Sequence, residues 1–198
     1  MVTRDASLKD CDSITEIHLR SFSRFFLSSL GRRFLKIFYK ACIKNPETIA
    51  IVCCMASGEI AGFAVGTSRS EDYYRKLLIK NIPVFSLEAA LLLFTRPKAL
   101  IRLALNLAKS DGTDDTDNAA ELLSIATLPE YTGSGIGKQL LEAFEVRLKE
   151  RDCTTVSLTT DYYDNADVVR FYQNVGYELK NDFITYPDRR MYRMIKTI

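Results

Sequence analysis

Apolar residues recur along the chain in two patterns, and together these predict one α/β fold. Runs rich in β-branched and aromatic residues predict strands. A short turn with glycine at 56–59, between two such runs, predicts a hairpin. The predicted strands are Val2–Arg4, Ile49–Met55, Ile60–Ser68, Leu122–Leu128, Thr154–Thr160, Tyr177–Ile184 and Arg189–Ile195.

Apolar positions three or four residues apart predict the helices. The first follows Asp10 or Asp12, either of which is a favoured capping residue. Further helices are predicted at Gly31–Ile43, Gly137–Glu150 and Asn165–Val175.

A long segment separates the third predicted strand from the fourth. Residues 71–109 predict two or three helices broken at Pro83 and Pro97, and a polar, acidic loop follows at 110–118. The order of elements predicts a single α/β domain over residues 1–198, with a mixed central sheet flanked by helices. The helical insertion and acidic loop occupy 69–119. A length of 198 residues suits one domain.

Charge and hydropathy exclude several classes of protein. The 27 Lys and Arg against 25 Asp and Glu give a formal charge of +2, which provides no global reason to expect nucleic acid or an anionic membrane as the main partner. Uninterrupted apolar runs such as Ala89–Phe94 are too short for a transmembrane helix. The first residues lack an apolar signal core, so a cytoplasmic location is expected.

The cysteines and the single histidine make metal and hydrolase chemistry poor candidates. Five cysteines show no Cys-x-x-Cys spacing, and those in apolar segments are expected to be small core residues. A zinc site is not expected with His18 as the one histidine, and neither is a Ser-His-Asp or Cys-His centre. We expect no metal cofactor.

The sequence from Thr132 to Lys138 has the composition of a phosphate cradle. Three alternating glycines follow a strand and precede a helix, so backbone N–H groups and the helix N-terminus are available to an anion. A Walker loop requires Ser or Thr where Gln139 stands. A Rossmann fingerprint requires a third glycine where Lys138 stands.

The run P-E-Y-T-G-S-G-I-G-K-Q-L-L from Pro129 resembles the acetyl-CoA loop of the GNAT superfamily of N-acetyltransferases. It departs from that pattern at Thr132, where the family usually has Arg or Gln. The segment from Asp164 to Tyr177, D-N-A-D-V-V-R-F-Y-Q-N-V-G-Y, resembles the family's next helix. The resemblance covers Ala120 to the C-terminus well and implies a GNAT-type fold, acetyl-CoA as co-substrate and N-acetyltransferase activity.

The same resemblance implies roles for individual residues. Tyr172 corresponds to the phenol that protonates the departing thiolate, although it is also interpretable as a packed aromatic. Asn165 corresponds to the residue that contacts the pantetheine arm, and it also suits a helix N-cap. The implied backbone contacts to the cofactor come from Ile125, Ala126, Thr127, Thr132, Gly133, Ser134, Gly135, Ile136, Gly137 and Lys138. The Lys138 side chain is interpretable either as a phosphate ligand or as a solvated lysine.

The acceptor amine must lose a proton, and the residue that removes it is left open. Glu121 resembles a glutamate that some histone acetyltransferases use as a base, and it is also interpretable as a solvated residue. Asp161, Tyr162 and Tyr163 are alternatives that act through water. Arg189 and Arg190 are interpretable as facing an anionic substrate or solvent, and solvent is the expectation.

The acceptor is predicted to be a primary amine of a small molecule, such as an amino sugar. A protein or peptide acetyltransferase and a non-catalytic CoA-binding sensor remain alternatives. The segment Tyr73–Lys109 carries a local charge of +6. It is interpretable as helices packed on the sheet or in a homodimer contact, as a lid over the acceptor, or as a basic element on a membrane surface.

Overall fold

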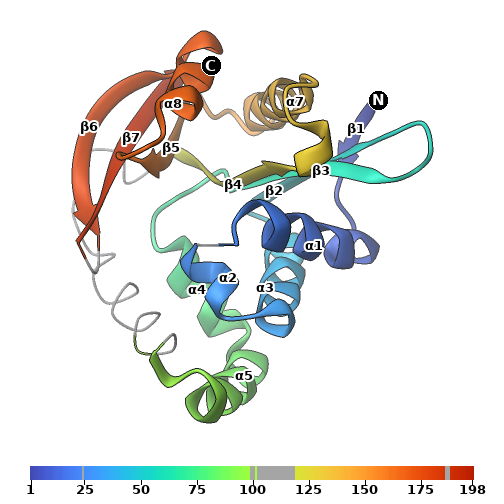
Figure 1. Ribbon diagram of the computed structural model, residues 1–198, viewed down its shortest axis with the longest axis vertical. Helices are drawn as coiled ribbons and strands as arrows, with labels where there is room; N and C mark the ends of the chain where they lie inside the picture. Colours follow the sequence, from blue (N-terminus) through green and yellow to red (C-terminus); the bar gives the residue numbers. More distant parts are fainter. Residues whose placement is uncertain (24, 99–100, 102–118, 186–187) are drawn as a thin grey trace.

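A seven-stranded mixed sheet forms the centre of the computed structural model, which describes residues 1–198 except 24, 99–100, 102–118 and 186–187 (Figure 1). Neighbouring strands are antiparallel except β4 and β5, which are parallel. In spatial order the strands are β1 (Val2–Asp5), β2 (Thr48–Cys54), β3 (Ile60–Thr67), β4 (Ala120–Thr127), β5 (Thr155–Asp161), β7 (Arg189–Thr197) and β6 (Glu178–Thr185).

Helices cover both faces of this sheet, as the view in Figure 1 shows. One face carries α1 (Cys11–Ser21), α2 (Phe26–Ser29), α3 (Arg32–Lys44), α4 (Tyr73–Lys80) and α5 (Ile82–Thr95). The opposite face carries α7 (Ile136–Lys149), and α8 (Ala166–Asn174) lies beside the β5, β7 and β6 part of the sheet. Two short 3-10 turns, Leu8–Asp10 and Pro129–Tyr131, precede α1 and α7.

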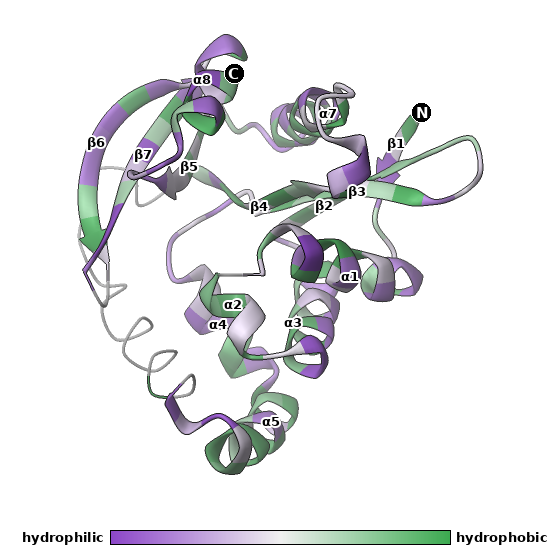
Figure 2. Cartoon of the chain, viewed as in Figure 1, coloured by the Kyte–Doolittle hydropathy of each residue, from purple (hydrophilic) through white to green (hydrophobic). Residues whose placement is uncertain are grey.

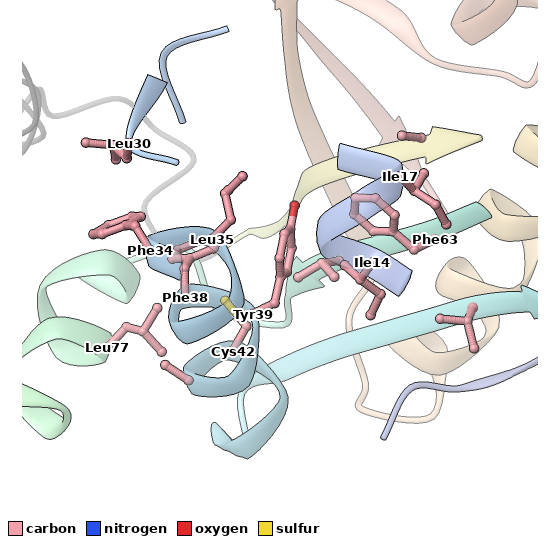
Figure 3. Close-up of a cluster of buried hydrophobic side chains, with 14 of the residues drawn as sticks. Ile14, Ile17, Leu30, Phe34, Leu35, Phe38, Tyr39, Cys42, Phe63 and Leu77 are labelled. Carbon is pink, nitrogen blue, oxygen red and sulfur yellow. The ribbon is translucent and has the colours of Figure 1, made fainter. Parts of the chain in front are cut away.

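The core is divided into two layers by the sheet. Ile14 and Ile17 of α1 pack with Leu35 and Tyr39 of α3 against Phe63 of β3 on one side (Figure 3). On the other side α7 buries every fourth residue: Ile136, Leu140, Phe144 and Leu148. This spacing places the four side chains in one row along α7, so a single helix covers the centre of the sheet.

The helix α7 lies so close to β3 that Gly66 has no room for a side chain. A Cβ atom there lies 2.3 Å from Phe144 Cζ and 2.4 Å from the Glu121 carbonyl oxygen. Glycine at this position therefore sets how closely α7 approaches the strand that carries Glu121.

The predicted fold is confirmed. All seven strands and the four helices form within a few residues of their expected ends, and α4 and α5 lie between the third and fourth strands. The predicted acidic loop at 110–118 falls outside the described residues. The four-residue α2 has no counterpart among the predictions, because so short a helix gives no periodic signal.

Two local predictions were wrong. The break between α4 and α5 lies at Asn81, not at Pro83, because proline is well tolerated in the first turn of a helix. Neither proposed aspartate caps α1 through its side chain. The Asp10 carboxylate instead accepts a hydrogen bond from the Ser7 N–H at 2.7 Å and pairs with Arg4 at 2.8 Å, so the pKa of Asp10 falls to about 2.

Among the described residues, no single helix is long and apolar enough to cross a membrane. The pair α4 and α5 meets that test together, but the two helices are bent by 93° where they join.

Candidate active site

The two parallel strands β4 and β5 separate after a short paired stretch. They pair from Ala120 and Val156 to Leu122 and Leu158. Beyond these residues β4 stays paired with β3, and β5 with β7. We call this separation the β4–β5 fork. Its two sides carry backbone groups that have no strand partner in the described part of the chain.

A β-bulge lies in β4 at the apex of the fork, directly after the last residues that pair with β5. Val65 of β3 pairs with Ser124 and Gly66 pairs with Leu122, so Leu123 is the extra residue. Bulges re-aim the residues that follow them. Ile125 and Ala126 pair with β3 on one side and border the fork on the other. The Thr127 carbonyl already accepts a hydrogen bond from the Ser21 hydroxyl at 2.8 Å, which joins α1 to this strand.

The glycine loop lies between β4 and α7 and has the backbone of an anion cradle. Gly133 and Gly135 have φ values of 80° and 84°, which favour glycine, and no atom lies within 4 Å of a Cβ built on either. The first backbone bond of α7 runs from the Gln139 N–H to the Gly135 carbonyl at 3.2 Å. The N–H groups of residues 136–138 thus have no acceptor in their own helix and fit a phosphate group.

The side chains of this loop contribute less than its backbone. The Ser134 hydroxyl donates to the Tyr131 carbonyl at 2.6 Å. Thr132 has extended backbone and ends the turn before the glycines. The Lys138 side chain is 63% exposed and its ammonium lies 3.8 Å from Glu142, which is the geometry of a solvated lysine in the first turn of a helix.

Gly137 brings the start of α7 against α8. A Cβ atom at Gly137 lies 3.3 Å from the Phe171 ring, so a larger residue there displaces that ring. The cradle and the helix that carries Asn165 and Tyr172 are therefore neighbours in space. The two sequence motifs, about 30 residues apart, therefore lie side by side.

Asn165 occupies the position before α8, but its side chain does not cap the helix. Its Nδ2 atom donates to the Thr160 hydroxyl at 2.7 Å and to the Asp161 carbonyl at 2.9 Å. The side chain thus fixes the connection between the end of β5 and α8, on the β5 side of the fork.

Tyr172 lies in the α7 layer of the core with its ring against Phe171 and Tyr177, at centroid distances of 5.3 and 5.7 Å. Only 7% of the residue is exposed. No described residue forms a hydrogen bond with its hydroxyl group. Burial raises the pKa of Tyr172 above the ordinary value for a phenol. The phenol is therefore protonated at neutral pH.

Glu121 lies next to the apex of the fork, where β4 is still paired with both neighbours. Burial raises its pKa, and the positive charge of Arg193 opposes this shift only in part. Its own charge helps to raise the pKa of the buried Tyr74 phenol of α4. Glu121 is thus a half-buried carboxylate on the α4 face of the sheet, rather than a solvated residue at the end of a loop.

Three residues beyond the fork form a contact that the sequence did not reveal. The Arg189 guanidinium pairs with Asp161 at 2.6 Å and lies over the Phe25 ring at 4.8 Å. This joins the end of β5, the start of β7 and the connection between α1 and α2. The expectation that Arg189 faces solvent was wrong, because a carboxylate and an aromatic face together hold its side chain.

Arg190 was also expected to face solvent, and it too has partners. Its guanidinium pairs with Asp182 at 2.7 Å and lies 4.0 Å from the centre of the Tyr162 ring. Tyr163 is exposed. Among the alternative bases, Asp161 is engaged with Arg189 and Tyr162 is covered by Arg190.

No group of three or more His, Cys, Asp and Glu side chains is placed to hold a metal ion within the described ranges. The five cysteines are free thiols, and Cys11, Cys42 and Cys53 are buried.

The sequence from residue 11 to 177 matches the model of the acetyltransferase (GNAT) family. The chain belongs to the GNAT family. This match spans α1 to the end of the α8 motif, so it includes the fork, the glycine loop and Tyr172.

Similar proteins include enzymes with quite different acceptors. The chain is 39% identical over 66 residues to GCN5-related N-acetyltransferase 2, chloroplastic, of Arabidopsis thaliana. That match covers 33% of this chain but only 24% of the plant protein.

Two solved structures share the fold over the whole chain. One is the ribosomal-protein-S18-alanine N-acetyltransferase of Escherichia coli, with 15% identity, a TM-score of 0.62 and 93% of that chain covered. The other is an aminoglycoside 6'-N-acetyltransferase complexed with coenzyme A, with 14% identity, a TM-score of 0.61 and 97% of that chain covered. Both cover 100% of this chain. At these identities the likeness shows a common fold.

Proposed function

We propose that this GNAT protein transfers an acetyl group from acetyl-CoA to a primary amine of a small molecule, such as an amino sugar. The observation that carries the proposal is the β4–β5 fork, with the glycine cradle after β4 and α8, the helix of Tyr172, after β5 and against the cradle at Phe171. Acetyl-CoA supplies an acetyl group activated as a thioester. The free N–H groups of Ile136, Gly137 and Lys138 fit its pyrophosphate, and the Asn165 segment fits its pantetheine arm.

The residues around the fork fit a direct transfer. The amine nitrogen forms a bond to the acetyl carbonyl carbon, and the bond between that carbon and sulfur breaks. Backbone donors near Ile125 and Ala126 stabilise the oxyanion that develops at the carbonyl. The protonated phenol of Tyr172 gives its proton to the departing thiolate, and Glu121 takes the proton that the amine releases, directly or through water.

A small acceptor is supported by the contact of Arg189 with Phe25 and Asp161. This contact joins the segment after α1 to the start of β7 and the end of β5, and we infer that these three elements narrow the approach to the fork. A narrow approach favours a small amine over a folded protein surface.

An acceptor screen tests this proposal. Release of the CoA thiol is followed with acetyl-CoA and, in turn, amino sugars, polyamines, amino acids and peptides with free N-termini. Turnover with small amines alone supports the proposal, whereas turnover restricted to peptides assigns the protein to the alternative class. Thermal stabilisation by CoA without turnover on any acceptor identifies a sensor, and the absence of stabilisation overturns the cofactor assignment.

A further inference from the structure

The helix α5 buries one narrow face and exposes the rest. Its buried residues are Phe85, Glu88 and Leu92, at helical spacing. The Phe85 ring lies 5.8 Å from that of Phe34, and Glu88 pairs with Arg33, so this face is attached to α3. In Figure 1, α5 lies at the lower end of the molecule, far from the sheet.

The outward half of α5 is almost entirely apolar. Phe94 is 85% exposed and Leu87 is 64% exposed. Figure 2 shows α5 mostly in the hydrophobic green, whereas more of α1 and α3 is in the hydrophilic purple. We define the α5 surface as the exposed apolar residues Ile79, Ile82, Val84, Leu87, Leu91, Leu93 and Phe94. Monomeric proteins rarely expose so many large apolar side chains together without a function.

Between Tyr73 and Lys98 the exposed charged side chains are all positive. Between Tyr73 and Lys98 the chain has five cationic residues and one carboxylate, Glu88, which is buried against Arg33. The segment therefore carries +4, while the whole chain carries +2, which leaves −2 for the remainder. Its exposed cations are Arg75, Lys80, Arg96 and Lys98.

We propose that the α5 surface binds an anionic lipid bilayer. Apolar side chains enter the boundary between headgroups and acyl chains, while Lys and Arg around them attract anionic headgroups. The α5 surface has both properties, and within the described stretch from Tyr73 to Lys98 the one carboxylate, Glu88, is buried. This proposal is independent of the catalytic assignments.

The dimensions of the two helices favour a position on the bilayer rather than across it. The 14 residues of α5 span about 21 Å, against about 30 Å for the hydrocarbon core of a bilayer. The 93° bend at Asn81 prevents α4 from extending that length. One face of α5 also stays attached to α3, so the opposite face is the one that meets lipid.

A second copy of the chain suits this surface less well. A two-fold contact places the same patch against itself, so the exposed cations of both copies would face one another without carboxylates between them. An anionic bilayer removes this repulsion.

Flotation of the full-length protein with vesicles tests the proposal. The wild-type protein is expected to float with vesicles of phosphatidylcholine and phosphatidylglycerol, and to float poorly with phosphatidylcholine alone. Replacing both Leu87→Ser and Phe94→Ser is expected to abolish flotation. The control Val146→Ser removes an exposed apolar residue of α7 and is expected to float normally.

The charge is tested separately. The double variant Lys80→Gln with Lys98→Gln is expected to partition about thirtyfold less onto the anionic vesicles, as two lysines near an anionic surface imply. Circular dichroism confirms that each variant is folded. Failure of the wild-type protein to float, equal flotation with both kinds of vesicle, or unchanged flotation of the Leu87 and Phe94 variant overturns the proposal. Light scattering provides a further test. The proposal is also overturned if the wild-type protein is a dimer and only the Leu87 and Phe94 variant is a monomer.

Discussion

The Nδ1 atom of His18 lies 2.6 Å from the Tyr39 hydroxyl oxygen, in the core between α1 and α3. The same hydroxyl donates a weaker bond to Ser124 Oγ at 3.4 Å, on β4 beside the bulge. His18 and Tyr39 are buried, so neither group has water as an alternative partner. The pair therefore ties the two helices of one layer to the strand that borders the β4–β5 fork.

Removing the Tyr39 hydroxyl is expected to destabilise the protein. Tyr39→Phe leaves a ring nitrogen of His18 buried without a partner, which costs about 1–3 kcal/mol. The free energy of unfolding in urea measures this loss. Tyr177→Phe is the matched control, because it removes another buried phenol hydroxyl that lies in the other core layer, away from His18. Equal losses in the two variants would contradict a stabilising role for the bond to His18.

His18 also predicts a dependence of stability on pH. Burial lowers the pKa of His18 to about 4, below its ordinary value of 6.5. Between these values the unfolded chain binds a proton that the folded protein does not, so this contribution is complete above about pH 6.5 and is lost as the pH falls towards 4. The full shift corresponds to roughly 3 kcal/mol.

The pH dependence is measured by urea unfolding at several values between pH 7 and 4.5. Carboxylates also titrate near the lower limit, so the wild-type protein is compared with His18→Asn, which does not titrate. The two proteins are expected to differ most in stability at neutral pH and to converge as the pH falls. A difference that does not vary with pH would rule out the titration of His18.

The glycine loop is tested by adding a single methyl group. Gly135→Ala forces an L-residue into the left-handed region, at a cost of about 1–2 kcal/mol, and places a Cβ atom in the cradle. We expect the thermal stabilisation by CoA to be largely lost. Gly58→Ala in the β2–β3 turn is the control, since its φ of 85° and its open surroundings are the same but it adds no methyl group to the glycine loop. An equal loss in both variants would mean that strain, rather than the cradle, is responsible.

The sequence predicts those parts of the site that depend on local patterns. The glycines, the row of apolar residues on α7 and the motif at Tyr172 are each contained in one segment. The contact of Arg189 with Phe25 joins residues that are distant in sequence, and no local pattern signals it. The sequence left the role of the α5 segment undecided for a related reason. Apolar content alone does not distinguish a buried helix from one whose outer half is exposed.

Tyr172→Phe is expected to reduce turnover without preventing CoA binding. Loss of a general acid lowers kcat about 100- to 10,000-fold, while the ring still fills the core beside Phe171 and Tyr177. Steady-state kinetics with the best acceptor measure kcat, and thermal shift measures CoA binding. Tyr177→Phe removes a neighbouring buried hydroxyl and is expected to keep its kcat. Unchanged turnover in Tyr172→Phe would remove the acid assignment.

Glu121 is tested by the pH dependence of kcat. As a base, Glu121 acts in its charged form, and burial raises its pKa. As the pH is lowered, kcat is therefore expected to begin falling at a higher pH than it would with an exposed carboxylate as the base. Glu121→Gln is expected to lower kcat at neutral pH and to remove this low-pH decline.

Glu130→Gln is the control, because that carboxylate is exposed, pairs with Arg20 at 2.9 Å and lies just after β4. It should leave the profile of kcat unchanged. A decline that persists in Glu121→Gln assigns the proton transfer to another group, whereas its loss there and not in Glu130→Gln identifies the half-buried carboxylate beside the fork as the base.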